Sequence, residues 1–188
     1  METKKSTKRT LQTIGKVAYV ISKIIFILGL IGASIGLTCM ISAAFVNWEW
    51  VRETIIDFAQ QHDLTLTWDV GTLTLKNAEV LSFGVLVKCG SGAVLTYFLM
   101  KLFGNIKDEG TPFTDSNVKL LMAVGITCLV EAFGVSLLLD IVVRATQTGA
   151  IFNYGSNFPN LIIALLVFAL ALVFKYGVEL QKEADTTL

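Results

Sequence analysis

Four long apolar runs dominate the pattern of hydrophobic and polar positions along the chain. An α-helix needs about 20 apolar residues to cross roughly 30 Å of hydrocarbon. Runs of this length lie at residues 20–46, 79–103, 118–143 and 157–176. The first has no charged residue after Lys23, and the fourth carries Pro159 in its first turn, where a proline sacrifices no hydrogen bond. The pattern predicts an all-α membrane protein, a bundle of four transmembrane helices.

The first run also has features of a cleavable signal peptide. A basic segment precedes it, and Ser42-Ala43-Ala44 is an acceptable small-residue cleavage site. The apolar stretch is about 22 residues long, however, whereas the apolar region of a signal peptide has about 7–15. We therefore expect the first run to be a permanent membrane anchor.

Between the first two runs, residues 47–78 have a pattern of their own. Apolar residues at i, i+4, i+7 and i+8 predict a short amphipathic helix from Glu49 to Gln61. These apolar residues are Val51, Ile55, Phe58 and Ala59. Apolar and polar positions then alternate through residues 64–68 and 72–75, on either side of an Asp/Gly turn. We therefore expect a small extracellular helix plus β-hairpin between the first two spans.

The remaining segments are short. They are a basic amino-terminal segment (1–19), a loop (104–117), a second loop (144–156) and a tail (177–188). Either Thr114 or Asp115 is expected to cap the third span by accepting a hydrogen bond from its first backbone N–H groups. The tail is expected to continue the fourth helix beyond the membrane, because Val178, Glu179 and Lys182 give it one apolar and one charged side.

The composition agrees with a membrane protein. Of the 188 residues, 54% are hydrophobic and 16% charged, and the mean hydropathy is +0.68. Fifteen Lys and Arg residues balance fifteen Asp and Glu residues, so nothing in the overall charge favours direct nucleic-acid binding. The three cysteines are too few for a disulfide-stabilised small domain.

The distribution of cations predicts the orientation, because Lys and Arg next to membrane spans are retained on the cytoplasmic side. An internal amino terminus places eleven of the fifteen cations inside: Lys4, Lys5, Lys8, Arg9, Lys16, Lys23, Lys101, Lys107, Lys119, Lys175 and Lys182. Only Arg52, Lys76 and Arg144 then lie outside, with Lys88 in the membrane. We therefore expect a multi-pass protein of a bacterial plasma membrane with both termini in the cytoplasm.

Three ionisable residues fall within the spans, where each costs at least about 2.5–3.5 kcal/mol. Lys88 and Asp140 are expected at similar depths near the outer boundary and are predicted to pair, with snorkelling of both side chains as the alternative. Nine residues at about 100° per residue place Glu131 on nearly the opposite face from Asp140. Glu131 therefore has no obvious partner. It is either a neutral, hydrogen-bonded acid or the site of a proton- or cation-coupled role.

No enzyme chemistry emerges from the sequence. Gly32-Ala33-Ser34-Ile35-Gly36 matches the nucleophile-elbow pattern, but it lies within the first span, and the single histidine, His62, lies in the external segment. Gly29, Gly32, Ala33 and Gly36 are better explained as a strip of small residues that lets two helices approach closely. Cys39, Cys89 and Cys128 lack metal-ligand spacing. We expect no catalytic site, cofactor or metal.

Two polar motifs carry a resemblance to a known family. Gly110, Pro112, Phe113, Asn117, Leu121 and Gly125 fit G-x-P-F-x-x-x-N-x-x-x-L-x-x-x-G, and Phe174, Gly177, Leu180, Gln181, Glu183 and Asp185 fit F-x-x-G-x-x-L-Q-x-E-x-D. With the four spans and the long first external loop, these resemble the YoaS-like bacterial membrane proteins, a family built on a domain of unknown function. The resemblance covers nearly the whole chain.

Members of that family are often encoded beside small helix-turn-helix regulators. The resemblance therefore implies a non-enzymatic membrane sensor or regulator that acts with a cytoplasmic helix-turn-helix transcription regulator. Its candidate partner-binding face consists of Gly110, Pro112, Phe113, Asn117, Gly177, Leu180, Gln181, Glu183 and Asp185. Two alternatives stay open: a small transport or immunity protein, acting through Glu131 and Lys88 and forming a homo-oligomer, or a structural subunit of a membrane assembly.

Overall fold

The computed structural model describes residues 2–47, 49–50, 53–54, 56–57, 75–146 and 158–186. Its helices are α1 (Glu2–Ala43), α3 (Leu75–Glu109), α4 (Asp115–Leu129), the π-helix η2 (Val130–Val135), α5 (Ser136–Thr146) and α6 (Phe158–Thr186). Since α4, η2 and α5 are continuous, the described residues contain four helical rods, each long and apolar enough to cross a membrane. The prediction of four helices long and apolar enough to span a membrane is confirmed.

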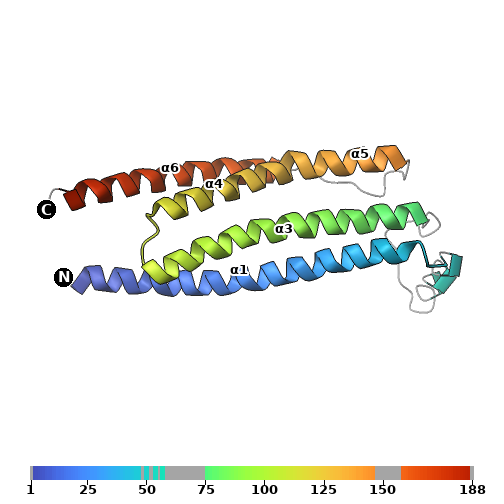
Figure 1. The fold of residues 1–188 in the computed structure, drawn as a ribbon, viewed down its shortest axis with the longest axis horizontal. Coiled ribbons are helices and arrows are strands. Elements are labelled where there is room, and N and C mark those ends of the chain that lie inside the picture. Colours follow the sequence, from blue (N-terminus) through green and yellow to red (C-terminus); the bar gives the residue numbers. More distant parts are fainter. Residues whose placement is uncertain are drawn as a thin grey trace.

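Successive rods run antiparallel, so the amino end of α1 and the carboxyl end of α6 lie at the same end of the molecule (Figure 1). Helix α1 packs on α3, α3 packs on α4, and α4 packs on α6. The chain therefore places its two terminal helices on opposite sides of the α3–α4 pair (Figure 1). The two described chain ends thus share one end of the molecule (Figure 1), and the cytoplasmic location of that end is a prediction from the cations.

Small residues at every seventh position form the interface of α1 with α3. Gly15, Ser22, Gly36 and Ala43 are buried, and Gly29 is half-buried. A Cβ atom built on Gly36 would lie 2.7 Å from the backbone N of Leu86, and one on Gly15 would lie 2.8 Å from the backbone N of Lys107. A seven-residue repeat keeps one seam facing the partner helix. The close approach predicted at Gly29, Gly32 and Gly36 is thus confirmed, and buried small residues continue along almost the whole of α1.

The second half of the molecule has a more conventional side-chain core. Leu102 of α3 and Leu121 of α4 pack with Ala171 of α6, and one layer deeper Val124 and Cys128 pack with Ala164. The ring of Phe168 packs directly against Gly125. A Cβ atom built at this glycine would lie 2.7 Å from the ring atom Cε1. These contacts hold α4 between α3 and α6.

The bounds differ from the predicted ones in three places. Helix α1 already includes the amino-terminal segment, from Glu2, and it ends at Ala43 rather than at residue 46. The third rod contains the π-helical segment η2 where an uninterrupted α-helix was expected. Finally, Leu75, assigned to the second strand of the hairpin, is the first residue of α3.

The predicted external structure falls mostly outside the described residues. The part of the chain that the structure describes contains no strand, and the rest of the predicted hairpin, residues 64–74, lies outside it. Of the predicted amphipathic helix, the described residues 49–50, 53–54 and 56–57 are helical. Asn47 precedes them and accepts hydrogen bonds from the backbone N–H groups of Glu49 and Trp50 at 3.2 and 3.3 Å, as a helix N-cap does.

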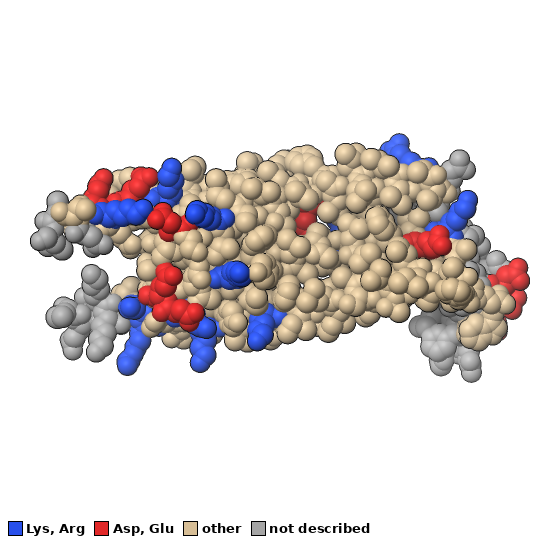
Figure 2. Space-filling model, viewed as in Figure 1, with Lys and Arg blue, Asp and Glu red and all other residues tan. Residues whose placement is uncertain are grey.

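Charged side chains gather at the two ends of the molecule and leave a wide apolar belt between them (Figure 2). The outer face of α1 contributes much of this belt, with Ile24, Leu28, Ile31 and Ile35 all about half exposed or more. In water such a surface would be unfavourable, whereas in lipid it is the expected exterior. A small acidic patch interrupts the belt near its middle (Figure 2).

Candidate functional site

Four cations mark one edge of the apolar belt: Lys23, Lys101, Lys119 and Lys175. Packing supports a common level for the first two, because the ring of Tyr19, one turn from Lys23, lies against Gly104, one turn from Lys101. Beyond this level α1 continues for about 30 Å and α6 for about 17 Å, at 1.5 Å per residue. We call this region the polar end. It comprises residues 2–22, 102–119 and 175–186, including the turn between α3 and α4.

The turn from α3 to α4 lies within the polar end and has a defined conformation. Gly110 adopts a positive φ of 70°, and its N–H donates to the carbonyl of Ile106 at 2.9 Å, which ends α3 as a glycine C-cap does. A Cβ atom at Gly110 would lie 2.7 Å from the Lys8 side chain of α1. Thr114 caps α4 by accepting a hydrogen bond from the N–H of Asn117, so the sequence prediction is resolved in favour of Thr114 over Asp115.

Asn117 holds this turn together from the inside. It is 0% exposed; its amide nitrogen donates to the carbonyl of Pro112 at 3.0 Å, and its Oδ1 atom accepts from Asn105 of α3 at 2.9 Å. A buried amide bonded in this way fixes the geometry of the groups around it. Asn117, predicted as part of the partner-binding face, therefore lies beneath that face and supports it.

The turn is also fastened to the tail of α6. The ring of Phe113 packs edge-on against Phe174, with centroids 5.4 Å apart, and covers Gly177, where a Cβ would lie 2.5 Å from the ring atom Cδ1. Lys182 Nζ lies 3.0 Å from Asp115 Oδ2. The two motifs that carry the resemblance, far apart in sequence, thus contact each other.

The other predicted partner-face residues differ in exposure. Leu180, Gln181 and Glu183 are exposed on the α6 tail, whereas Pro112 is half-buried in the turn. Gly110 is buried against α1, and the side chain of Asp185 lies outside the described part of the structure. The accessible portion of the predicted face is therefore the tail of α6 together with the rim of the turn.

The sequence divides its charge unevenly between two sets of segments. Residues 1–23, 101–119 and 175–188 contain eleven Lys and Arg against seven Asp and Glu. Residues 47–79 and 140–157 contain three against seven. The zero net charge of the chain is thus the sum of a basic set and an acidic set of segments, with Lys88 and Glu131 in neither.

A polar contact joins two spans near the middle of the apolar belt. Ser91 Oγ of α3 lies 2.8 Å from Oε1 of Glu131, the second residue of η2. Ser91 is ten residues from Lys101 and Glu131 twelve residues from Lys119, which puts both at a depth of about 15–18 Å. Sequence reasoning found Glu131 but missed its partner. The available signal was a serine between Gly90 and Gly92, at the same depth in the neighbouring span.

The register of this contact also bears on Lys88 and Asp140. Because α3 and the third rod are antiparallel and Ser91 faces Glu131, Lys88 lies about 5 Å in depth from Glu131 and about 9 Å from Asp140. Asp140 Oδ2 is 3.9 Å from Arg144, one turn along α5, and both side chains are largely exposed. The Lys88–Asp140 pair stays a prediction, while the register brings Lys88 closer in depth to Glu131.

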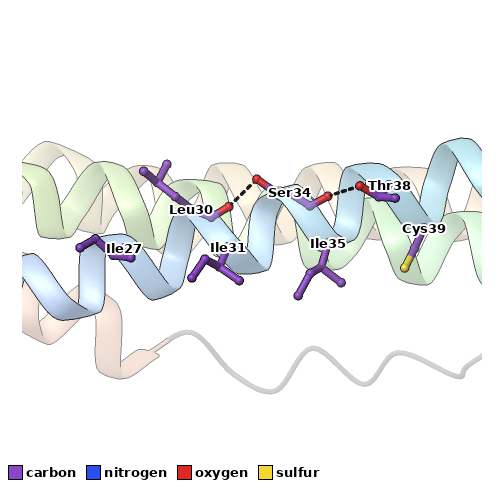
Figure 3. Close-up of a pocket in the computed structure, with 7 residues that line it drawn as sticks. All are labelled: Ile27, Leu30, Ile31, Ser34, Ile35, Thr38 and Cys39. Carbon is purple, nitrogen blue, oxygen red and sulfur yellow. Dashed lines mark hydrogen bonds between the residues drawn. The ribbon is translucent and has the colours of Figure 1, made fainter.

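The outer face of α1 carries a shallow apolar groove (Figure 3). Its lining residues are Ile27, Leu30, Ile31, Ser34, Ile35, Thr38 and Cys39. The hydroxyl groups of Ser34 and Thr38 donate to the carbonyls of Leu30 and Ser34, one turn back in the same helix, at 2.8 and 2.9 Å (Figure 3). Ser34 is therefore an ordinary residue of a continuous helix, in agreement with the rejection of the nucleophile-elbow match.

Within the described residues, no group of three or more His, Cys, Asp or Glu side chains could hold a metal ion, and the three cysteines are free thiols.

Comparison with curated proteins and with solved structures gave no match for the chain. A family model described as "Protein of unknown function (DUF2975)" matches residues 47–188, about three quarters of the chain, including both polar motifs, Ser91 and Glu131. The chain therefore belongs to the DUF2975 family.

Proposed function

We propose that this protein is a non-enzymatic membrane regulator whose polar end binds a soluble cytoplasmic partner. The observation that carries the proposal is the fastening of the α3–α4 turn to the α6 tail by Phe113 on Gly177 and by the Lys182–Asp115 ion pair. A surface ordered before binding loses less conformational entropy when a partner docks. The turn and the tail together meet this condition.

Leu180 is the natural anchor of this surface. It is 47% exposed and lies five residues, or about 8 Å, beyond Lys175, so it is outside the apolar belt. Its exposed neighbours Gln181 and Glu183 are polar. An apolar side chain within a polar rim is the usual arrangement of a protein-binding surface.

The amino-terminal part of α1 contributes the positive charge. Lys8 and Arg9 are exposed and lie about 22 Å along the helix from Lys23, which is well beyond a Debye length of about 8 Å from the membrane edge. Their charge is therefore directed toward a soluble partner rather than lipid headgroups, and the docking face of that partner is acidic. The resemblance to the YoaS-like proteins supplies its class, a helix-turn-helix transcription regulator.

The test is co-purification of the intact protein from native membranes, with the purified material searched for a small helix-turn-helix protein. Leu180→Ala is expected to reduce capture about fivefold, because truncating an anchoring side chain costs roughly 1 kcal/mol or more. Val173→Ala is the matched control. Val173 is exposed on nearly the same face of α6 as Leu180, but it lies two turns away, on the apolar-belt side of Lys175. This variant should capture as much partner as the wild type.

Two results would contradict the proposal. One is the absence of the regulator from the purified material together with unchanged transcription after deletion of the protein. The other is an equal effect of Leu180→Ala and Val173→Ala on capture. The cytoplasmic location of the polar end is tested separately, by labelling Glu183→Cys in intact cells with a membrane-impermeant thiol reagent, which should leave this position unmodified.

A further inference from the structure

The Ser91 hydroxyl has two acceptors within hydrogen-bond distance. Glu131 Oε1 lies 2.8 Å away, across the helix interface, and the backbone carbonyl of Lys88 lies 3.1 Å away in the same helix. A hydroxyl group has a single proton to donate, although its oxygen can also accept. Ser91 therefore donates to only one of the two groups at a time.

We propose that Ser91 and Glu131 form a proton-binding site in the middle of the membrane. When Glu131 is ionised, the Ser91 hydroxyl donates a hydrogen bond to Oε1. When Glu131 takes up a proton, the new carboxyl O–H donates to Ser91 Oγ, and the serine hydroxyl turns to donate to the carbonyl of Lys88. One proton is gained, no covalent bond other than the new O–H forms, and Ser91 Oγ and Glu131 Oε1 stay hydrogen-bonded to each other in both states.

The surroundings suit a site of this kind. An unsatisfied carboxyl group in hydrocarbon is strongly unfavourable in either form, and Ser91 relieves both forms without moving its backbone. Glu131 also belongs to η2, a single π-helical segment inside an otherwise α-helical rod, and such segments occur frequently at functional sites. Glu131 is only half-buried, so it is not sealed inside the protein.

The charged and titratable neighbours can be named for each packed element. On α3 they are Lys88, about 5 Å away in depth, and Cys89, whose sulfur contacts α1 at Gly32. On α4 the neighbour is Cys128, one turn before Glu131, and on α5 it is Asp140, about 13 Å outward in depth. Helix α6 has no titratable residue between Pro159 and Phe174. Lys88 is therefore the cation of the described residues that lies nearest in depth.

The test is infrared difference spectroscopy of the full-length protein in lipid nanodiscs, stepped from about pH 10 to about pH 4. Surface carboxyl groups give a broad background that all variants share. The wild type is expected to gain a distinct protonated-carboxyl C=O band from a water-poor environment. That band is lost in Glu131→Gln, is shifted in frequency in Ser91→Ala, and is retained in Ser91→Thr, which keeps the hydroxyl group.

Ser34→Ala is the matched control, because Ser34 is a serine of a neighbouring span whose hydroxyl bonds only to its own helix. It should leave the band unchanged. A band that survives in Glu131→Gln, that does not shift in Ser91→Ala, or that responds to sodium concentration rather than to pH overturns the proposal. Should Glu131→Gln fail to fold, Ser91→Ala against Ser34→Ala still decides it.

This site does not depend on the soluble partner. Glu131→Gln is expected to leave capture of the helix-turn-helix protein unchanged, whereas Leu180→Ala is expected to leave the infrared band unchanged. Failure of either proposal is therefore seen separately from failure of the other.

Discussion

Replacement of Gly36 by alanine tests a close approach between the backbones of α1 and α3. The new Cβ atom would lie 2.7 Å from the backbone N of Leu86 and 3.0 Å from the carbonyl oxygen of Ser82. Both are backbone atoms of α3, so no side chain can rotate away. To restore an ordinary contact of 3.4 Å, the helices must separate by about 0.7 Å at this point.

The cost of this separation can be estimated from the same interface. Because α1 is a stiff rod, the gap extends to its neighbouring contacts, where Gly32 meets Cys89 and Gly29 meets Ala93. A gap of about 0.5–1 Å forfeits roughly a quarter to a half of the dispersion energy of each atom pair. Overpacking of this kind costs about 1–3 kcal/mol, and alanine returns at most about 1 kcal/mol through its higher helix propensity. With the full return subtracted, we expect a net loss of up to about 2 kcal/mol.

The measurement is unfolding of the purified protein in mixed micelles by increasing SDS, followed by circular dichroism. Gly92→Ala is the matched control, because a Cβ atom at Gly92 of α3 meets nothing within 4 Å. That variant should be as stable as the wild type or more stable by up to about 1 kcal/mol. If Gly36→Ala is as stable as Gly92→Ala, the close packing of α1 on α3 through glycine is refuted.

Three further substitutions test the polar end by the same SDS titration. Asn117→Ala leaves the groups bonded to its buried amide without partners and is expected to cost about 1–3 kcal/mol. Thr114→Ala removes the cap of α4 and should cost about 1 kcal/mol, whereas Thr114→Ser keeps the capping oxygen and should be nearly neutral. Lys182→Ala removes an exposed ion pair with Asp115 and should cost less than about 1 kcal/mol, an effect that disappears at high salt. Equal losses for Asn117→Ala and Lys182→Ala would contradict this ranking.

Local properties of the chain were predicted well. The four spans depend only on the length and apolarity of each run, and both are visible in sequence. The cap at Thr114 depends on a side-chain oxygen next to the first turn of α4. The sequence therefore narrowed the choice of capping residue to two neighbours, Thr114 and Asp115. The helical tail of α6 depends on its own apolar stripe, and Val178 is indeed buried.

Features that depend on the alignment of two helices were predicted less well. The partner of Glu131 follows from the register of α3 against the third rod, and the sequence contains no direct record of that register. The helix formed by residues 2–19 also depends on packing against another helix and was not predicted. Its small residue Gly15 packs against α3 at Lys107, and this contact supports a helix in a segment whose own composition indicated only a basic tail.

The sequence by itself therefore determined that this member of the DUF2975 family has four helices long and apolar enough to span a membrane, and its cation distribution predicts which end is cytoplasmic. Both follow from the transfer of apolar and charged groups between water and hydrocarbon, which acts on each segment separately. The tertiary structure decided that the turn at 113–115 packs against residues 174–182 of α6, and that Ser91 faces Glu131. These are distances between segments remote in sequence, and they are set by how small residues and rings interlock when the rods pack.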